Sequence, residues 1–157
     1  EELLAAAAAA LRAHGVRVGG LVQHSRRSGD DVRCTIEVES IADGRRYLLS
    51  QDTSDDPTEC TLDTAVLAEA SGALRQALAQ QVDLVIVNKF GKQEAAGRGL
   101  RGEILQIALA GVPLLTTVSR RHLPQWQEFI GDDVTLLEPA LPAVLAWWNA
   151  HTGPAAA

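Results

Sequence analysis

The sequence predicts an α/β domain of three layers, in which a mainly parallel sheet lies between helices on both faces. Two segments lead to this interpretation: residues 84–87 read Leu-Val-Ile-Val, and residues 114–118 read Leu-Leu-Thr-Thr-Val. A strand that is apolar on both faces belongs in the interior of a parallel sheet. The segments around these strands show helical spacing instead, and strands that alternate with helices indicate a sheet covered on both faces.

The composition is that of a soluble globular protein with one domain. The chain has 157 residues, of which 46% are apolar and 22% are charged. This length suggests a single core. We expect the domain to span residues 1–152 and residues 153–157 to form a frayed tail.

Charge and hydropathy exclude several classes of function. The formal net charge of −6 argues against general nucleic-acid binding, and no apolar stretch reaches the roughly 18 residues of a membrane-spanning helix. The apolar run at residues 3–11 follows two acidic residues, whereas a secretory signal begins with basic ones. Cys34 and Cys60 form no CxxC pair and have no histidine cluster nearby, which indicates buried thiols of a cytoplasmic protein.

The first expected element is a helix over residues 3–11, where leucines stand among alanines, the strongest helix formers. Gly15 then ends this helix. Because an α/β domain usually opens with a strand, we expect a first strand and a phosphate-binding loop to precede the helix in a longer protein. The alternative is that the domain starts at the helix itself.

An antiparallel hairpin, attached to the sheet, is expected next. Alternating valines predict a strand over residues 16–23, in which Gly19-Gly20 permits a bulge or close packing. Residues 32–39 alternate between apolar and polar side chains, the pattern of a half-buried strand. The turn sequence Asp43-Gly44 then leads into a strand over residues 46–50.

The second half of the chain alternates helices and strands. Thr61 or Asp63 can cap a helix whose apolar residues recur at helical spacing as far as Leu78. A strand at residues 82–87 follows, and a second helical stripe begins at Leu100. The remaining expected elements are a helix stop at residues 111–113, a strand at 114–118, a helix at 122–129, a short strand at 134–137 and a helix at 141–149.

The polar, glycine-rich stretch at residues 88–99 is the best candidate for a binding site. It follows the buried strand, and in open α/β sheets ligands bind beyond the carboxyl ends of such strands. Its glycines permit backbone conformations closed to other residues, and the next helix adds a dipole that favours an anion. The predicted contributors are Asn88, Lys89, Gly91, Lys92, Gly97, Arg98, Gly99 and Arg101. The alternative is a solvated loop with ordinary salt bridges.

The other polar side chains near this stretch have two interpretations each. Glu94, its only carboxylate, can act in catalysis by positioning a water or a metal, or it can be a structural partner of Lys92 or Arg98. Gln51 and Asp52 end a predicted strand and can face the same crevice. For Asp52, capping of a loop is the simpler role.

Other catalytic patterns are missing from the sequence. The four histidines are scattered and show no metal-ligand spacing, so we expect no metal site built from side chains. Neither a GxSxG motif nor a GxxxxGK(S/T) phosphate loop occurs. Ser119-Arg120-Arg121 follows a predicted strand and can line the same sheet edge, although two adjacent arginines more often form the solvated start of a helix.

Residues 85–100 resemble the signature of an uncharacterised bacterial family. The resemblance lies in the string Val85-Ile86-Val87-Asn88-Lys89-Phe90-Gly91-Lys92-Gln93-Glu94-Ala95, followed by Gly97-Arg98-Gly99-Leu100. Further matches at residues 20–23, 50–52, 60–63 and 126–129 extend it over nearly the whole chain. Members of this family are related to P-loop nucleoside-triphosphatases and are often found near genes for molybdenum uptake or cofactor synthesis.

The resemblance implies a P-loop-like fold with a degenerate catalytic motif. In the related nucleoside-triphosphatases the equivalent strand ends in Asp-Glu, of which the aspartate helps to hold Mg²⁺ and the glutamate assists hydrolysis. Asn88 and Lys89 stand at those positions here, whereas Gly91 and Glu94 match the related pattern. An asparagine is a poorer Mg²⁺ ligand than a carboxylate, and a charged lysine cannot accept a proton.

Three functions are open on these grounds. The leading hypothesis is binding of a nucleotide, such as ATP or GTP with Mg²⁺, or of another phosphate-like anion, with weak or no hydrolysis. The second is an active nucleoside-triphosphatase or kinase-like enzyme that uses residues upstream of this chain. The third is an accessory protein that handles molybdate, another oxyanion or a cofactor. We expect neither nucleic acid nor a membrane as a partner.

Overall fold

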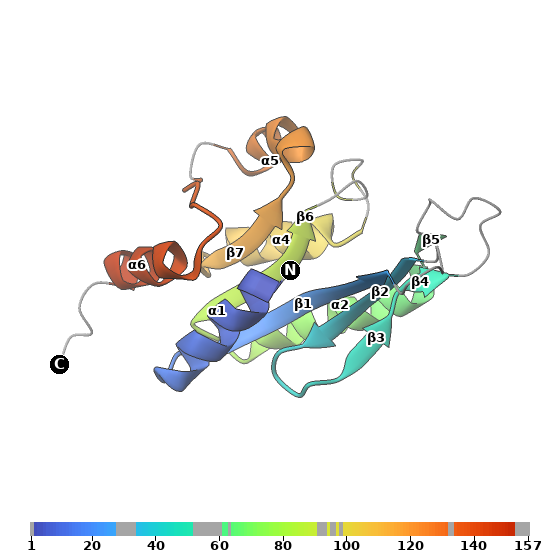
Figure 1. The fold of residues 1–157 in the computed structure, drawn as a ribbon, viewed down its shortest axis with the longest axis horizontal. Helices are drawn as coiled ribbons and strands as arrows, with labels where there is room; N and C mark the ends of the chain where they lie inside the picture. The colour runs from blue at the N-terminus through green and yellow to red at the C-terminus, as the bar shows by residue number, and fades with distance from the viewer. Residues whose placement is uncertain are drawn as a thin grey trace.

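The computed structural model describes residues 2–27, 34–51, 61–62, 64–90, 94, 97, 99–131 and 134–152. Its main sheet has five strands in the order β3-β2-β1-β6-β7 (Figure 1). These strands are β1 (Val18–Arg27), β2 (Cys34–Ser40), β3 (Arg46–Leu48), β6 (Leu84–Phe90) and β7 (Leu114–Val118). A separate two-stranded sheet pairs β4 (Ser50–Gln51) with β5 (Thr61–Leu62).

The main sheet is mixed, which corrects the expectation of a mainly parallel sheet. β6 pairs in parallel with both β1 and β7, whereas β2 is antiparallel to both β1 and β3. The expected antiparallel hairpin exists, but β1 itself is one of its strands, because β1 continues past its pairing with β6 and along β2. The α/β class is confirmed, and the P-loop type of fold stays a prediction.

Helices cover both faces of the main sheet (Figure 1). They are α1 (Glu2–Ala13), α2 (Thr64–Ala79), α4 (Arg101–Leu109), α5 (Leu123–Ile130) and α6 (Leu141–Thr152), with a 3-10 helix, η1 (Arg120–His122), before α5. α1 and α6 share one hydrophobic core with the sheet, and α2 and α4 share the other. Thr61 lies in β5 and so does not cap α2, and the other predicted cap, Asp63, lies outside the described residues.

The strand β6 is the centre of both cores. Its first four side chains, from Leu84 to Val87, are all 0% exposed. Leu84 and Ile86 belong to the core under α1 and α6, whereas Val85 and Val87 belong to the core under α2 and α4. The alternation follows from strand geometry, in which successive side chains point to opposite faces, and it confirms the predicted buried strand.

β6 continues to Phe90, three residues beyond the predicted end of the strand. Phe90 is 1% exposed and pairs with Val118 of β7 after a shift in register. Asn88 and Lys89 therefore belong to the strand and not to the loop that the sequence predicted. The physical reason is the burial of the Phe90 ring, because a large aromatic side chain is stabilised most inside the core. Since Phe90 is held in the core, the backbone of the two polar residues before it continues the strand.

Gly19-Gly20 lets β1 approach its neighbours closely, as the sequence predicted. A Cβ at Gly20 would overlap the backbone oxygen of Ile86 in β6. Gly20 also has a φ of +115°, a conformation that favours glycine. A Cβ at Gly19 would lie 2.8 Å from the Cβ of Ala77 in α2. The pair of glycines thus allows both the β1–β6 pairing and the packing of α2 on the sheet.

The predicted turn at Asp43-Gly44 connects the antiparallel strands β2 and β3. Gly44 has a φ of +74°. The backbone N–H of Arg45 donates to Asp43 Oδ1 at 3.0 Å, and this hydrogen bond holds the pKa of Asp43 below its usual value. The strand predicted over residues 46–50 is split in two, because buried Leu49 separates β3 from β4.

Residues 134–137, predicted as a strand, form no regular secondary structure. Val134 packs against the core under α2 and α4, and Leu137 packs against the core under α1 and α6. The segment joins α5 to α6 (Figure 1). Its apolar residues therefore serve two different cores and not one face of a strand, which explains why the prediction was wrong.

Gly20→Ala should lower the free energy of unfolding by several kcal/mol. Strain at the positive φ alone costs about 1–3 kcal/mol, and the overlap with Ile86 adds to it. Gly102→Ala is the matched control, because nothing lies within 4 Å of a Cβ there and alanine in a helix should add roughly 0.5–1 kcal/mol. Urea unfolding measures both changes. A Gly20→Ala variant as stable as the parent would contradict the close contact of β1 with β6.

Candidate functional site

Two parallel strands end side by side at one edge of the sheet (Figure 1). Phe90 at the end of β6 pairs with Val118 at the end of β7. β6 leads through the glycine-containing loop into α4, and β7 leads into η1 and α5. The groups that follow both strands therefore share the edge at which open α/β sheets bind ligands.

Glu94 ties the loop to the start of α4. Its backbone carbonyl accepts the N–H of Gly97 at 3.1 Å, and its Oε1 accepts the N–H of Leu100 at 3.3 Å. The side chain of Glu94 is 9% exposed. Gly97 and Gly99 have φ values of +86° and +63°, which favour glycine and let the chain fold back on Glu94. The structure thus gives Glu94 a structural contact with the Leu100 N–H. The partners that the sequence suggested for it, Lys92 and Arg98, lie outside the described residues.

The Glu94 carboxylate lies at the amino end of α4, where the sequence predicted a bound anion. A carboxylate there is stabilised by the helix dipole, as a bound anion would be. The Leu100 N–H, one of the donors that such an anion would use, already donates to Glu94. An anion at this edge would therefore depend on donors other than this N–H.

Three aromatic rings form a cluster at the end of β6, namely Phe90 of β6 and Trp126 and Phe129 of α5. Phe90 lies edge-on to Trp126, with ring centroids 5.1 Å apart, and stacks on Phe129 at 5.9 Å. Trp126 and Phe129 are 6.3 Å apart, and Trp126 is 7% exposed. These distances lie in the range of favourable aromatic pairs. The cluster fixes α5 against the end of β6, and no local pattern in the sequence indicated that Phe90 belongs to it.

Arg101, a predicted anion ligand, lies on this aromatic cluster. Its guanidinium carbon is 4.5 Å from the centroid of the Phe129 ring, a cation–π distance. Gly97 is close by, since a Cβ there would lie 3.3 Å from Arg101 Nη1. The structure therefore brings together Gly97, Gly99 and Arg101 around the first turn of α4 and adds Phe129, while their role in binding stays a prediction.

Ser119 and His122 form a hydrogen-bonded turn after β7. Ser119 Oγ lies 2.9 Å from His122 Nδ1, and the His122 N–H donates to the Ser119 carbonyl at 2.9 Å. Arg120 and Arg121 follow β7 at the same edge and are exposed. Over the described ranges, no three His, Cys, Asp or Glu side chains are grouped so as to hold a metal ion. No helix in the described part of the chain is long and apolar enough to cross a membrane.

The rest of the predicted site is described only in part. The backbone of Asn88 and Lys89 lies in β6. Gln51 lies in β4, in the small sheet that Figure 1 shows toward the carboxyl end of β1. The remaining predicted contributors, which lie outside the described residues, are Gly91, Lys92, Arg98 and Asp52.

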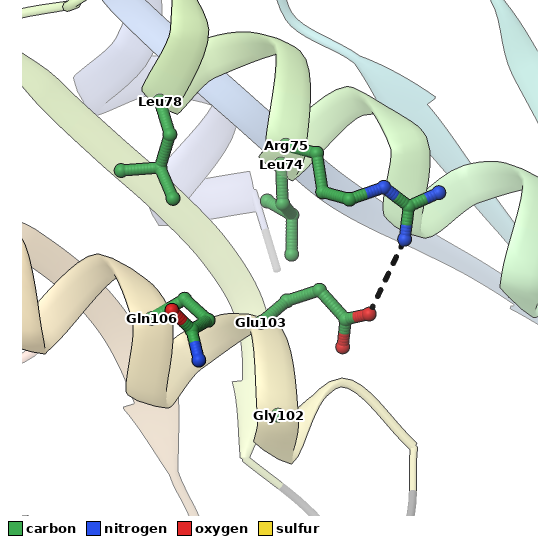
Figure 2. A pocket seen from close by; sticks show the side chains of 6 residues that line it. All are labelled: Leu74, Arg75, Leu78, Gly102, Glu103 and Gln106. Carbon is green, nitrogen blue, oxygen red and sulfur yellow. Dashed lines mark ion pairs between the residues drawn. The ribbon is translucent and has the colours of Figure 1, made fainter.

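A hollow of about 420 Å³ lies between α2 and α4 (Figure 2). Arg75 Nη1 lies 3.6 Å from Glu103 Oε1 at its rim, and Leu74 is fully buried. The complete lining is Leu74, Arg75, Leu78, Gly102, Glu103 and Gln106. The sequence did not predict this groove. The one local feature that could have indicated it is Gly102, because a glycine on a helix leaves space where a side chain would otherwise lie. No predicted anion ligand lines it.

Comparison with known proteins identifies the family. A family model described as "Protein of unknown function (DUF2478)" matches residues 1–147. The chain belongs to this family. That result confirms the resemblance to an uncharacterised family, while the relation of DUF2478 to P-loop nucleoside-triphosphatases stays a prediction. No solved structure matches the chain significantly.

One curated relative of this DUF2478 chain comes from Bradyrhizobium diazoefficiens. It is named "Molybdenum import ATP-binding protein ModC 2" and is 39% identical over 149 residues. The match covers 95% of this chain but 17% of the relative. The chain thus spans a small part of that protein's length, and the relative's name describes the whole of the larger protein.

Glu94→Ala should destabilise the domain more than Glu94→Gln does. Alanine leaves the buried Leu100 N–H without this acceptor, at a cost of about 1–3 kcal/mol, whereas glutamine keeps an acceptor oxygen and loses only the charge next to the helix dipole, worth roughly 0.3–1 kcal/mol. Urea unfolding and hydrogen exchange of the Leu100 amide measure the difference. Equal stability of the two variants would show that the carboxylate does not hold the loop.

Proposed function

We propose that this domain binds the phosphate groups of a nucleotide, or another phosphate-like anion, at the carboxyl edge of β6, with slow or no hydrolysis. The observation that carries the proposal is the junction of β6 with α4. A strand buried on both faces ends there, and Gly97 and Gly99, both with positive φ, precede a helix whose first residue is Arg101. Because the N–H groups of Gly97 and Leu100 already donate to Glu94, the ligand would use the Arg101 guanidinium and the remaining N–H groups of the first turn of α4.

The curated relative supports a nucleotide as the ligand. The Bradyrhizobium protein is named as ATP-binding, and its similarity extends over 95% of this chain. Because this chain spans 17% of that protein, ATP binding by this domain is part of the proposal. The resemblance of residues 85–100 to P-loop nucleoside-triphosphatase relatives points in the same direction and suggests ATP or GTP with Mg²⁺.

Slow hydrolysis follows from the residues at the end of β6. Asn88 and Lys89 stand where the related enzymes carry Asp and Glu, and this chain holds no GxxxxGK(S/T) phosphate loop. In phosphoryl transfer, Mg²⁺ and the lysine of such a loop supply most of the charge stabilisation. Glu94, the one remaining acid of the stretch, already accepts the Leu100 N–H. An active enzyme would need residues from outside this chain.

A second candidate function is the binding of molybdate or a similar oxyanion by an accessory protein. The name of the Bradyrhizobium relative, which includes molybdenum import, favours it. Molybdate and phosphate are both tetrahedral oxyanions, so the same cationic donors can bind either one. The two candidates differ in ligand and share the site.

Calorimetry should detect salt-sensitive binding of at least one of ATP, GTP, phosphate and molybdate. Salt sensitivity is expected because the attraction is between charges near the surface. Lys92→Ala with Arg98→Ala should weaken it, whereas Arg45→Ala with Arg46→Ala, which removes the same charge from the hairpin, should change it little. Unchanged affinity in the first double variant would reject this site, and no binding of any probe would reject the proposed function.

Release of phosphate from ATP or GTP with Mg²⁺ should lie near background. Each 1.4 kcal/mol of lost charge stabilisation slows the reaction about tenfold, and several stabilising groups are missing. Glu94→Gln should therefore change the rate little. Turnover on the order of 1 per second that Glu94→Gln abolishes would show that the domain is an active enzyme.

A further inference from the structure

The Arg101 guanidinium contacts an aromatic face, as Arg45 does over the Tyr47 ring, and in this it differs from Arg75 and Arg12. Arg75 donates to Ser71 Oγ at 3.2 Å and pairs with Glu103. Arg12 donates to a backbone carbonyl at 3.0 Å. Among the described residues, Arg101 has no such acceptor, and its one recorded contact is the face of the Phe129 ring at 4.5 Å.

Stacking on a ring leaves the donors of an arginine available. The five N–H groups of a guanidinium point outward in its plane, whereas the Phe129 ring contacts its flat face. The ring is itself fixed, because Phe129 stacks on Phe90 with an interplanar angle of 23° and lies against buried Trp126. Arg101 thus lies on an ordered apolar surface, and no carboxylate within the described ranges accepts its N–H groups.

Gly97 leaves space beside one edge of this guanidinium. A Cβ at Gly97 would lie 3.3 Å from Arg101 Nη1, closer than an ordinary contact. The φ of +86° at Gly97 further disfavours any side chain there. The edge that carries Nη1 therefore faces the glycine-containing loop at the carboxyl end of β6, where the proposed ligand binds.

We infer that Phe129 is a positioning residue, which holds Arg101 so that its guanidinium edge binds two oxygens of a tetrahedral oxyanion, and that Gly97 keeps the approach to Nη1 open. The inference rests on the proposed function and names the chemistry of its ligand. Two parallel N–H groups match two oxygens of one phosphate-like group, a geometry that a lysine cannot provide. The oxyanion is either the phosphate of a nucleotide or a free ion.

The test is calorimetry of four variants with phosphate, molybdate and ATP as separate probes. Phe129→Leu keeps an apolar side chain but removes the ring face, and should weaken each probe that binds by roughly three- to tenfold. Phe129→Tyr keeps the ring and should restore the parent affinity. Arg101→Ala should weaken binding by at least as much as Phe129→Leu, and Phe129→Leu should then have no further effect in the Arg101→Ala background.

Arg101→Lys keeps the charge and tests the paired geometry without touching the aromatic cluster. We expect a loss of roughly tenfold for each probe that binds. Full affinity in Arg101→Lys would overturn the two-oxygen geometry, and full affinity in Phe129→Leu, or an equal loss with and without Arg101, would overturn the positioning role. A loss confined to ATP would identify the bound oxyanion as the phosphate of a nucleotide, and a loss for phosphate or molybdate as well would identify it as a free ion. If the parent chain binds no probe, the proposed function fails first.

Discussion

The pairing of β1 with β6 is the contact on which the rest of the structure depends. It is close because Gly20 has no Cβ where the backbone of Ile86 lies, and because Gly19 lets Ala77 of α2 pack directly on the sheet. This pairing puts the most apolar strand of the chain between two others, with a core on each face. Every element at the candidate site is held, directly or through β7, by that buried strand.

The site is built outward from the core. Phe90 is buried, and it carries β6 past its apolar run to the aromatic cluster, where Trp126 and Phe129 hold α5. Glu94 then closes the loop onto the start of α4. The result is a fixed Arg101 beside a glycine-containing loop, at the edge where α/β proteins bind ligands.

Local sequence patterns predicted most helices and strands of this fold. They did not predict contacts between segments that are far apart in the chain. The apolar run of β6, the helical stripes of α2 and α4, and the close packing at Gly19-Gly20 are all encoded within a few residues. The burial of Phe90 depends on Trp126 and Phe129 of α5, which lie 36 and 39 residues further along the chain, so the end of the strand was predicted too early. Residues 134–137 looked like a strand because their apolar residues meet two cores. The pairing of Arg101 with Phe129 has no local signal at all.

The binding of an anion where β6 meets α4 is tested most directly by following the backbone amide signals of the protein by NMR while phosphate, molybdate or ATP is added. We expect the largest shifts at Gly97, Gly99 and Arg101, while Leu78 and Gln106, in the groove between α2 and α4, stay unchanged. Shifts centred on that groove, or no shifts with any of the three ligands, would contradict it.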